Sequence, residues 1–242
     1  MSNNKQLVVI TGASSGIGMA LAKIFSKNGH PLLIIARRLE ILQKLNLPDT
    51  MCKQVDVRDF TDFKNAILDA EKIYGKTDLL INNAGIMPLE IYSGEDLQEK
   101  YDIVDINLKG VINGIDCVLK DMIVRKHGTI VNVSSVAGRW TSDAHAVYNA
   151  SKFGVTALTE AIRRENASSN VRFITIEPAI VDTDLLLTGK NKKLIDEYNV
   201  VKSSINNGLT SDEVAEVIFY SYNLPQHVNL KEIVLSHTLQ KI

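Results

Sequence analysis

Residues 11–18 read Thr11-Gly12-Ala13-Ser14-Ser15-Gly16-Ile17-Gly18, and they join an apolar run, Leu7 to Thr11, to a stretch with helical spacing of apolar side chains, Gly16 to Asn28. Glycine permits a tight turn, and it allows close approach of backbone to phosphate and of helix to strand. The start of the helix offers free N–H groups and a positive dipole end, beside two serine hydroxyls. We therefore interpret these residues as the phosphate-binding turn of a dinucleotide site.

The same alternation of apolar runs and helical patterns continues along the chain. We expect strands over 7–11, 32–36, 51–55, 79–82, 129–133, 171–176 and 233–235, and helices over 16–28, 60–74, 95–126, 144–166 and 212–224, with Asp143 as a possible N-cap. Strands that are apolar throughout are buried on both faces, and strand–helix alternation gives a parallel sheet. We predict an α/β protein: a single Rossmann-type domain over residues 1–242, a doubly wound parallel sheet of about seven strands with helices on both faces.

Composition and charge exclude several classes of function. The chain has 242 residues, is 45% hydrophobic and carries a formal net charge of −1. We therefore expect neither nucleic acid nor an anionic membrane surface as a partner. Cys52 and Cys117 fit no metal spacing and no disulfide framework, so no metal is expected. Without a signal peptide or an apolar run of membrane length, we expect a cytoplasmic protein.

Two arginines, Arg37 and Arg38, follow the second expected strand. A site selective for NAD would normally have Asp or Glu here, to bind the ribose 2′-hydroxyl. A guanidinium group matches a phosphate in charge and shape. The alternative, two solvated charges at the start of a helix, is unfavourable because the helix dipole is positive there. We infer NADP rather than NAD as the cofactor.

Ser135, Tyr148 and Lys152 form a candidate proton-transfer site. An unperturbed phenol titrates near about 10. A lysine four residues later on a helix lies one turn away on the same face, and its charge would favour the phenolate. The Ser135 hydroxyl could hold a substrate oxygen beside the phenol. A tyrosine and a lysine four residues apart on a helix are common in ordinary surface contacts. The expected nucleotide-binding turn makes a catalytic role for this pair more credible.

Several motifs in order resemble the short-chain dehydrogenase/reductase family over nearly the whole chain. They are the glycine loop, Asp56 after the third strand, Asn82-Asn83-Ala84-Gly85, Asn107 in a helix, Ser134-Ser135 with Tyr148-x-x-x-Lys152, and Pro178-Ala-Ile-Val181-Asp-Thr183. The family's spacing selects Ser135 over Ser134. Ala179 departs from the family, which usually has glycine there. The arginine pair and residues 224–229 look like the NADP-dependent 3-hydroxy acid dehydrogenase and serine 3-dehydrogenase group.

The resemblance implies roles for individual residues. The expected catalytic residues are Ser135, Tyr148, Lys152 and Asn107. The expected cofactor-binding residues are Gly12, Ser14, Ser15, Gly16, Ile17, Gly18, Arg37, Arg38, Asp56, Val57, Asn83, Ala84, Gly85, Tyr148, Lys152, Pro178, Val181 and Thr183. Tyr148 would be the general acid or base, with Lys152 lowering its pKa and Asn107 holding a water.

The implied activity is NADP-dependent interconversion of an alcohol and a carbonyl, with a small 3-hydroxy acid or a related small aldehyde or ketone as substrate. A ketoreductase for a bulkier hydrophobic ketone and a non-catalytic NADP sensor remain as alternatives. The family also implies a homotetramer, with a dimer as the second possibility.

Charged residues near the expected site leave two interpretations open. Arg139 either binds a substrate carboxylate or is a solvated loop charge, and the second is favoured. The polar stretch 183–210 is expected to be a mobile substrate lid, because it interrupts the alternation next to the nicotinamide segment. Its lysines, Lys190, Lys192 and Lys193, are interpreted as a solvated face.

Overall fold

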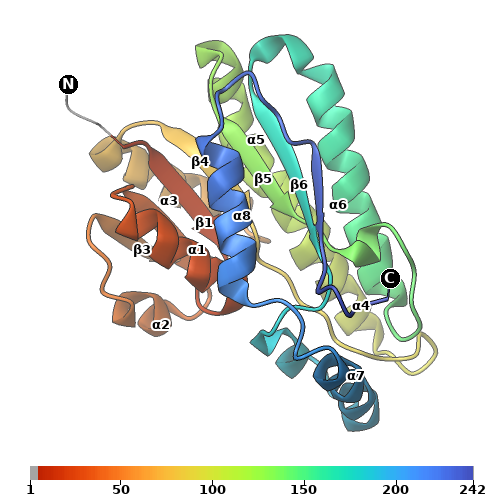
Figure 1. Ribbon diagram of the computed structural model, residues 1–242. Coiled ribbons are helices and arrows are strands. Elements are labelled where there is room, and N and C mark those ends of the chain that lie inside the picture. Colours follow the sequence, from red (N-terminus) through yellow and green to blue (C-terminus); the bar gives the residue numbers. More distant parts are fainter. Residues whose placement is uncertain (1–4, 242) are drawn as a thin grey trace.

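A computed structural model describes residues 5–241 and contains one seven-stranded parallel sheet (Figure 1). Its order is β3-β2-β1-β4-β5-β6-β7. The strands are β1 (Leu7–Thr11), β2 (Leu32–Ala36), β3 (Thr50–Gln54), β4 (Thr77–Asn82), β5 (Thr129–Val133), β6 (Arg172–Pro178) and β7 (Glu232–Leu235). The order reverses between β1 and β4, where open α/β sheets bind ligands at their carboxyl edge. The predicted doubly wound sheet is confirmed.

Helices cover both faces of the sheet. One layer holds α1 (Gly16–Lys27), α2 (Leu39–Lys44) and α8 (Ser211–Asn223), which pack on Val8 and Ile10. The other holds α3 (Phe60–Tyr74), α5 (Gly110–Arg125) and α6 (Ala146–Glu165), which pack on Leu7 and Val9. Successive strand residues point to opposite faces, so one apolar run supplies both cores. This arrangement explains why the inner strands read as unbroken hydrophobic segments.

The structure differs from the prediction at three helices. The expected helix over 95–126 consists of α4 (Leu97–Val104), a π-helical turn (Asp105–Lys109) and α5. The short helix α2 was not predicted, because only Leu42 of its six residues is buried. The N-cap of α6 is His145, with no side-chain cap bond, so the prediction of Asp143 was wrong. The reason is that Asp143 lies too far before the first helical residue, Ala146.

The polar stretch 183–210 contains structure that the sequence did not predict. A 3₁₀ turn, Asp184–Thr188, leads into α7 (Lys192–Ser204), whose N-cap Asn191 accepts a hydrogen bond from Leu194 N. In Figure 1, α7 lies apart from the two helical layers, at the end of the sheet toward which the strands point. Among the described residues, no helix combines the length and apolar character needed to span a membrane.

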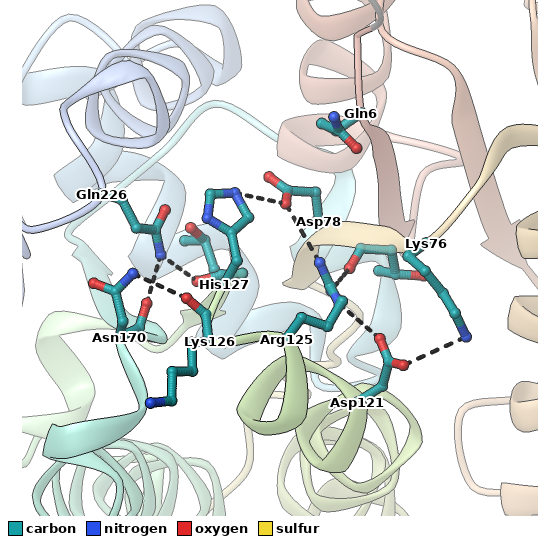
Figure 2. Close-up of polar contacts among 12 residues, drawn as sticks. Gln6, Lys76, Asp78, Asp121, Arg125, Lys126, His127, Asn170 and Gln226 are labelled. Carbon is teal, nitrogen blue, oxygen red and sulfur yellow. Dashed lines mark hydrogen bonds and ion pairs between the residues drawn. The ribbon is translucent and has the colours of Figure 1, made fainter.

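A network of polar side chains lies at the amino-terminal edge of the sheet (Figure 2). The carboxylate of Asp78 is buried at the start of β4. Its Oδ2 accepts a hydrogen bond of 2.7 Å from the Tyr222 hydroxyl on α8, and its Oδ1 lies 3.1 Å from His127 Nε2. Arg125 lies 3.8 Å from the same carboxylate and 2.7 Å from Asp121. The network ties α8 to the sheet at the edge opposite the carboxyl ends of the strands.

Candidate active site

The glycine-rich turn after β1 has the backbone that a phosphate site requires. Gly12 and Gly16 adopt φ values of 68° and 51°, which side chains rarely tolerate. The N-cap of α1, Ser15, makes no side-chain cap bond, so the first N–H groups of the helix are not capped from within. Gly18 acts by packing instead, because a Cβ there would lie 2.3 Å from the carbonyl oxygen of Gly12.

A cleft of about 660 Å³ lies at the carboxyl edge of the sheet. It brings together most of the predicted site residues: Gly12, Ser14, Ser15, Gly16, Ile17, Arg37, Arg38, Asp56, Val57, Asn83, Ala84, Gly85, Ser135, Tyr148, Lys152, Pro178, Val181 and Thr183. Two predicted residues, Gly18 and Asn107, do not line it. The helix N-terminus, the open glycine backbone and two arginines form a donor set that fits a dinucleotide with an additional phosphate.

Arg37 and Arg38 lie exposed at one end of the cleft. Arg38 Nη2 donates a hydrogen bond of 3.0 Å to Ser14 Oγ, which joins it to the phosphate-binding turn. Nearby, Asp56 accepts a charged hydrogen bond of 2.7 Å from Arg58, which holds the pKa of that carboxyl below its ordinary value. Arg58 thus neutralises the acidic group at this end, while the two arginines keep guanidinium donors at the cleft.

Ser135, Tyr148 and Lys152 converge at the other end of the cleft. Helix α6 places Tyr148 and Lys152 one turn apart, with the ammonium 5.6 Å from the centre of the phenol ring. Lys152 Nζ donates a hydrogen bond of 2.9 Å to the carbonyl oxygen of Val133. Ser135 caps a 3₁₀ turn, Val136–Gly138, by accepting from Ala137 N, and its hydroxyl lies 3.3 Å from the Pro178 carbonyl.

Burial dominates the ionisation of both groups on α6. It raises the pKa of Tyr148, while the nearby Ser135 hydroxyl lowers it and Tyr198 raises it further. Burial also lowers the pKa of Lys152 to about 8. The sequence predicted a lowered pKa for Tyr148, and the structure has the opposite direction. The prediction considered the charge of Lys152 and left out the cost of burying a phenolate.

Asn107 lies in the π-helical turn, buried behind the cleft. Its amide accepts a hydrogen bond from Ile86 N and donates one to Ile86 O, each of 2.9 Å. It also donates to Ser151 Oγ at 3.2 Å. The side chain therefore ties the segment after β4 to α6. A Cβ on Gly85 would lie within 4 Å of both Asn107 Oδ1 and Lys152 Nζ, so the two groups flank the same glycine.

Arg139 does not line the cleft, and so the structure does not support its binding a substrate carboxylate. Its guanidinium pairs instead with Glu177 and Glu232 on β6 and β7. The predicted lid lysines Lys190, Lys192 and Lys193 are exposed, as expected for a solvated face. No group of side chains suited to a metal ion occurs within residues 5–241.

Sequence reasoning missed the residues that α7 brings to the cleft, Tyr198 and Lys202. Burial raises the pKa of Tyr198 to about 12. The His145 ring lies 6.1 Å from the Tyr148 ring and 6.3 Å from the Tyr198 ring, and burial lowers its pKa. Lys202 Nζ pairs with Asp182 at 2.5 Å. The spacing of Ile195, Tyr198 and Lys202 along one helical face was a signal that could have identified them.

Comparisons with known proteins identify the family of the chain. A family model described as short chain dehydrogenase matches residues 6–193. An uncharacterized oxidoreductase of Listeria monocytogenes is 37% identical, over 99% of each chain. The closed form of a serine dehydrogenase complexed with NADP+ is 27% identical, with a TM-score of 0.89 over 98% of this chain and 97% of the other. Serine dehydrogenase from Escherichia coli is 27% identical, with a TM-score of 0.84 over 98% of this chain and 100% of the other.

The family model spans most of the chain and includes the glycine-rich turn and every strand of the sheet except β7. The relative from Listeria monocytogenes is an oxidoreductase that aligns over 99% of both chains, and the family uses a nicotinamide cofactor. The chain belongs to the short-chain dehydrogenase family.

Proposed function

We propose that this protein is an NADP-dependent oxidoreductase that interconverts an alcohol and a carbonyl. The observation that carries the proposal is a single cleft with Ser135, Tyr148 and Lys152 at one end and two arginines at the other. A nicotinamide cofactor, when bound, supplies or accepts the hydride. The chain's own residues then have to orient the reactants and move one proton.

Tyr148 carries that proton. In carbonyl reduction it acts as the general acid, and in alcohol oxidation as the general base. Ser135 donates a hydrogen bond to the substrate oxygen, which gains negative charge in the transition state. Lys152 would hold the nicotinamide ribose and stabilise charge on the phenol. Asn107 would fix Lys152 and the segment after β4 in place, through its bonds to Ile86 and Ser151.

The preference for NADP rests on Arg37 and Arg38. Both line the cleft, and neither forms a salt bridge among the described residues, so both guanidinium groups can pair with a phosphate. The structural relative described above binds NADP+, which supports the same choice. Along the cleft, Gly12, Ser14, Ser15, Gly16 and Ile17 would hold the pyrophosphate. Asp56 and Val57 would lie at the adenine, and Asn83, Ala84, Gly85, Pro178, Val181 and Thr183 at the ribose and nicotinamide.

For the substrate, we propose a small 3-hydroxy acid or a related small aldehyde or ketone. The likeness to serine dehydrogenases supports this class. Since Arg139 is paired elsewhere, a carboxylate would need another partner. Lys202 is the lysine of the segment 183–210 that lines the cleft, and it could exchange Asp182 for a substrate carboxylate.

A bulkier hydrophobic ketone is the second candidate. The observation that favours it is the apolar wall beside Tyr148, formed by Met87, Leu185 and Leu186. Such a wall would stabilise an apolar substrate by burial, and it would offer a carboxylate no hydrogen bonds to offset the loss of its hydration. The presence of both Tyr148 and Lys152 argues against a protein that only senses NADP.

We propose that residues 183–210 act as the substrate lid. Helix α7 contributes Tyr198 and Lys202 to the cleft, and none of its side chains is fully buried. A segment with so few buried contacts opens at low cost in free energy.

A homotetramer is the proposed assembly, with a dimer as the alternative. Helices α4 and α6 pack against each other, and the outer sides of α4, α5 and α6 expose Leu97, Tyr101, Val104, Ile112 and Phe153. Exposed apolar side chains that gather on neighbouring helices are typical of protein interfaces. Multi-angle light scattering should give four times the chain mass. A monomer at micromolar concentration would contradict the proposal.

The test of the activity is a turnover screen with NADPH and NADP+, run in parallel with NADH and NAD+. It should include 3-hydroxy acids, serine, small aldehydes and bulky ketones. Tyr148→Phe should reduce kcat about 100-fold or more on any good substrate, because it keeps the ring and removes the proton donor. NADPH binding should stay within about 2-fold, as measured by cofactor fluorescence. Turnover by Tyr148→Phe within a few-fold of the unsubstituted protein would contradict the mechanism.

A further inference from the structure

A fully buried carboxylate, Glu177, lies behind the reactive end of the cleft. It is on β6, directly before Pro178, and its exposed fraction is 0%. The proposed mechanism gives this residue no part, and it does not line the cleft. Burying an ionised carboxylate is costly unless it is paired and hydrogen-bonded, so its partners identify what it holds.

One oxygen of Glu177 faces the loop that carries Ser135. Glu177 Oε2 accepts a hydrogen bond from Arg139 Nε, four residues after Ser135. Arg139 Nη2 donates to Glu232 on β7, so the guanidinium bridges a buried carboxylate and an exposed one. The loop that begins at Ser135 is thereby fixed at its far end to two strands of the sheet.

The other oxygen of Glu177 faces the helix that carries Tyr148 and Lys152. Glu177 Oε1 accepts a hydrogen bond of 3.0 Å from Thr156 Oγ1, one turn after Lys152 on α6. Thr156 Oγ1 lies 2.9 Å from Ser134 Oγ, which itself donates to the carbonyl oxygen of Lys152 at 3.1 Å. Glu177 is therefore linked, through one intermediate side chain in each direction, to both elements that carry reactive groups.

Close packing gives this connection little freedom. A Cβ on Gly138 would lie 2.6 Å from Ser134 Oγ and 2.9 Å from both Lys152 O and Thr156 Oγ1. The 3₁₀ turn after Ser135 thus rests directly on α6. A shift of either element changes the distance between the Ser135 hydroxyl and the Tyr148 phenol, and hydrogen bonds weaken steeply with such changes.

We propose that Glu177 and Arg139 are positioning residues that set the distance between Ser135 and Tyr148 by holding the Ser135 loop against α6. The inference rests on the proposed function, since it assigns these residues a role in that same chemistry. They act through Ser135 and touch neither substrate nor cofactor. Glu232 is an outer partner that satisfies the remaining side of the guanidinium.

The experiment is a double-mutant cycle that combines Arg139→Gln or Glu177→Gln with Ser135→Ala. Each amide variant should reduce kcat about 10- to 100-fold, with NADPH affinity within about 2-fold. In the Ser135→Ala background the same substitutions should reduce kcat less than 3-fold further, because the group they position is absent. Glu232→Gln is the matched control, and it should leave kcat within about 2-fold.

The pH dependence of alcohol oxidation gives a second readout. Burial and Tyr198 raise the pKa of Tyr148, and the Ser135 hydroxyl lowers it. Lys152 and His145 also lie beside the Tyr148 ring. Release of Ser135 should therefore raise the pKa of Tyr148. The rising limb of kcat/KM should move to higher pH in Arg139→Gln and Glu177→Gln, as in Ser135→Ala. A purely structural role would lower active-enzyme concentration without moving that limb.

If Arg139→Gln does not fold, because Glu177 is left buried and unpaired, the double variant Arg139→Gln/Glu177→Gln removes both charges and takes its place. Losses that multiply fully with that of Ser135→Ala, or an unchanged pH profile, overturn the positioning role. The two proposals fail in different ways. If the proposed function is wrong, either no substrate is turned over by the unsubstituted protein, or Tyr148→Phe and Ser135→Ala keep full turnover. If only the positioning role is wrong, Tyr148→Phe and Ser135→Ala still lose turnover. Arg139→Gln and Glu177→Gln then either keep full turnover or lose it to the same extent with and without the Ser135 hydroxyl.

Discussion

Tyr148 and Lys152 are each shifted toward their neutral form by burial. The pKa of the phenol is raised, and the pKa of the lysine falls to about 8. Lys152 therefore changes charge at about pH 8, where the Tyr148 phenol keeps its proton. A buried phenol suits the donation of a proton to a carbonyl oxygen, which is the reductive direction of the proposed reaction.

The first prediction concerns the pH dependence of carbonyl reduction. Below about pH 8 the Lys152 ammonium is charged, and kcat/KM should be constant; above it the charge is lost and kcat/KM should fall. Lys152→Met should lower the plateau roughly 100-fold and remove the falling limb. Steady-state kinetics from pH 6 to 10 with NADPH measure both. If the fall in kcat/KM near pH 8 persists in Lys152→Met, that fall reports the titration of another group.

The same shift predicts an effect on stability. Since the folded pKa is lowered, the unfolded chain binds more protons between about pH 8 and the ordinary lysine value, and stability should rise with pH in that window. Lys152→Met has no such group. It should unfold at higher urea concentration at pH 7, with the difference narrowing toward pH 10. A difference that widens with pH would contradict the assignment.

The arginines after β2 give a prediction on cofactor choice. A hydrogen bond to a charged group contributes about 1.5–3 kcal/mol. Arg38→Ala or Arg37→Ala should therefore weaken NADPH binding roughly 10- to 100-fold and leave NADH binding nearly unchanged. Lys44→Ala, an exposed change of equal charge on α2, is the control. Fluorescence titration gives both dissociation constants, and equal losses for NADPH and NADH would refute the assignment.

At the scale of residues, the sequence predicted well whatever depends on short spacing. The glycine turn and the pair Tyr148 and Lys152 are local, and their geometry follows from one turn or one helix. Arg139 shows the limit, because its partners Glu177 and Glu232 lie 38 and 93 positions away. No local pattern indicates which charges meet across two strands of a folded sheet.

Helix α7 is the longer of the two helices that the sequence did not predict, the other being α2. It has no fully buried side chain, so its pattern lacks the broad apolar stripe of a core helix. Only Leu194, Ile195 and Tyr198 contact the cluster around Tyr148. The helices predicted within one or two residues, α1, α3, α6 and α8, each pack apolar side chains on the sheet.

A prediction follows for the lysine that α7 brings to the cleft. If the substrate is a hydroxy acid, Lys202→Met should raise KM about 10-fold or more for acidic substrates and leave KM for neutral ones unchanged. NADPH affinity should not change. Lys192→Met, exposed on the same helix, is the matched control. An equal KM for acids in both variants would favour the bulkier neutral ketone.

On the scale of the whole molecule, the two edges of the sheet serve different purposes. The carboxyl edge holds the cleft, and the amino edge holds the network around Asp78 shown in Figure 2. Arg172, buried at the start of β6, adds hydrogen bonds to the carbonyl oxygens of Ser221, Tyr222 and Leu224. Charged groups thus fasten the end of α8 to the sheet far from the reactive residues.

This separation predicts a change in stability without a change in catalysis. Tyr222→Phe removes the hydroxyl that donates to the buried Asp78 carboxylate and should lower the free energy of unfolding by about 1–3 kcal/mol. Tyr220→Phe, exposed on the same helix, should cost less than about 0.5 kcal/mol. Urea denaturation measures both, with kcat/KM unchanged. A Tyr222→Phe protein as stable as Tyr220→Phe would show that the bond contributes nothing.

The overall architecture was predictable because the inner strands are buried on both faces and read as apolar runs. The edge strands β3 and β7 are only partly buried, yet their predicted bounds were within one residue, and the largest errors, of two residues, fell at one end of the buried strands β4 and β6. The lid, by contrast, depends on how the chain returns over the cleft, which strand and helix periodicity do not encode.

The π-helical turn between α4 and α5 constrains how this molecule can change in length. A π turn holds one more residue than an α turn, and one residue corresponds to a rotation of about 100° around a helix axis. It lets α4 face α6 while α5 faces β4 and α3. Deleting a single residue from 105–109 would restore a regular helix, turn one half away from its neighbour and displace Asn107. Among relatives, insertions and deletions should therefore be absent from 97–125 and should gather at its ends.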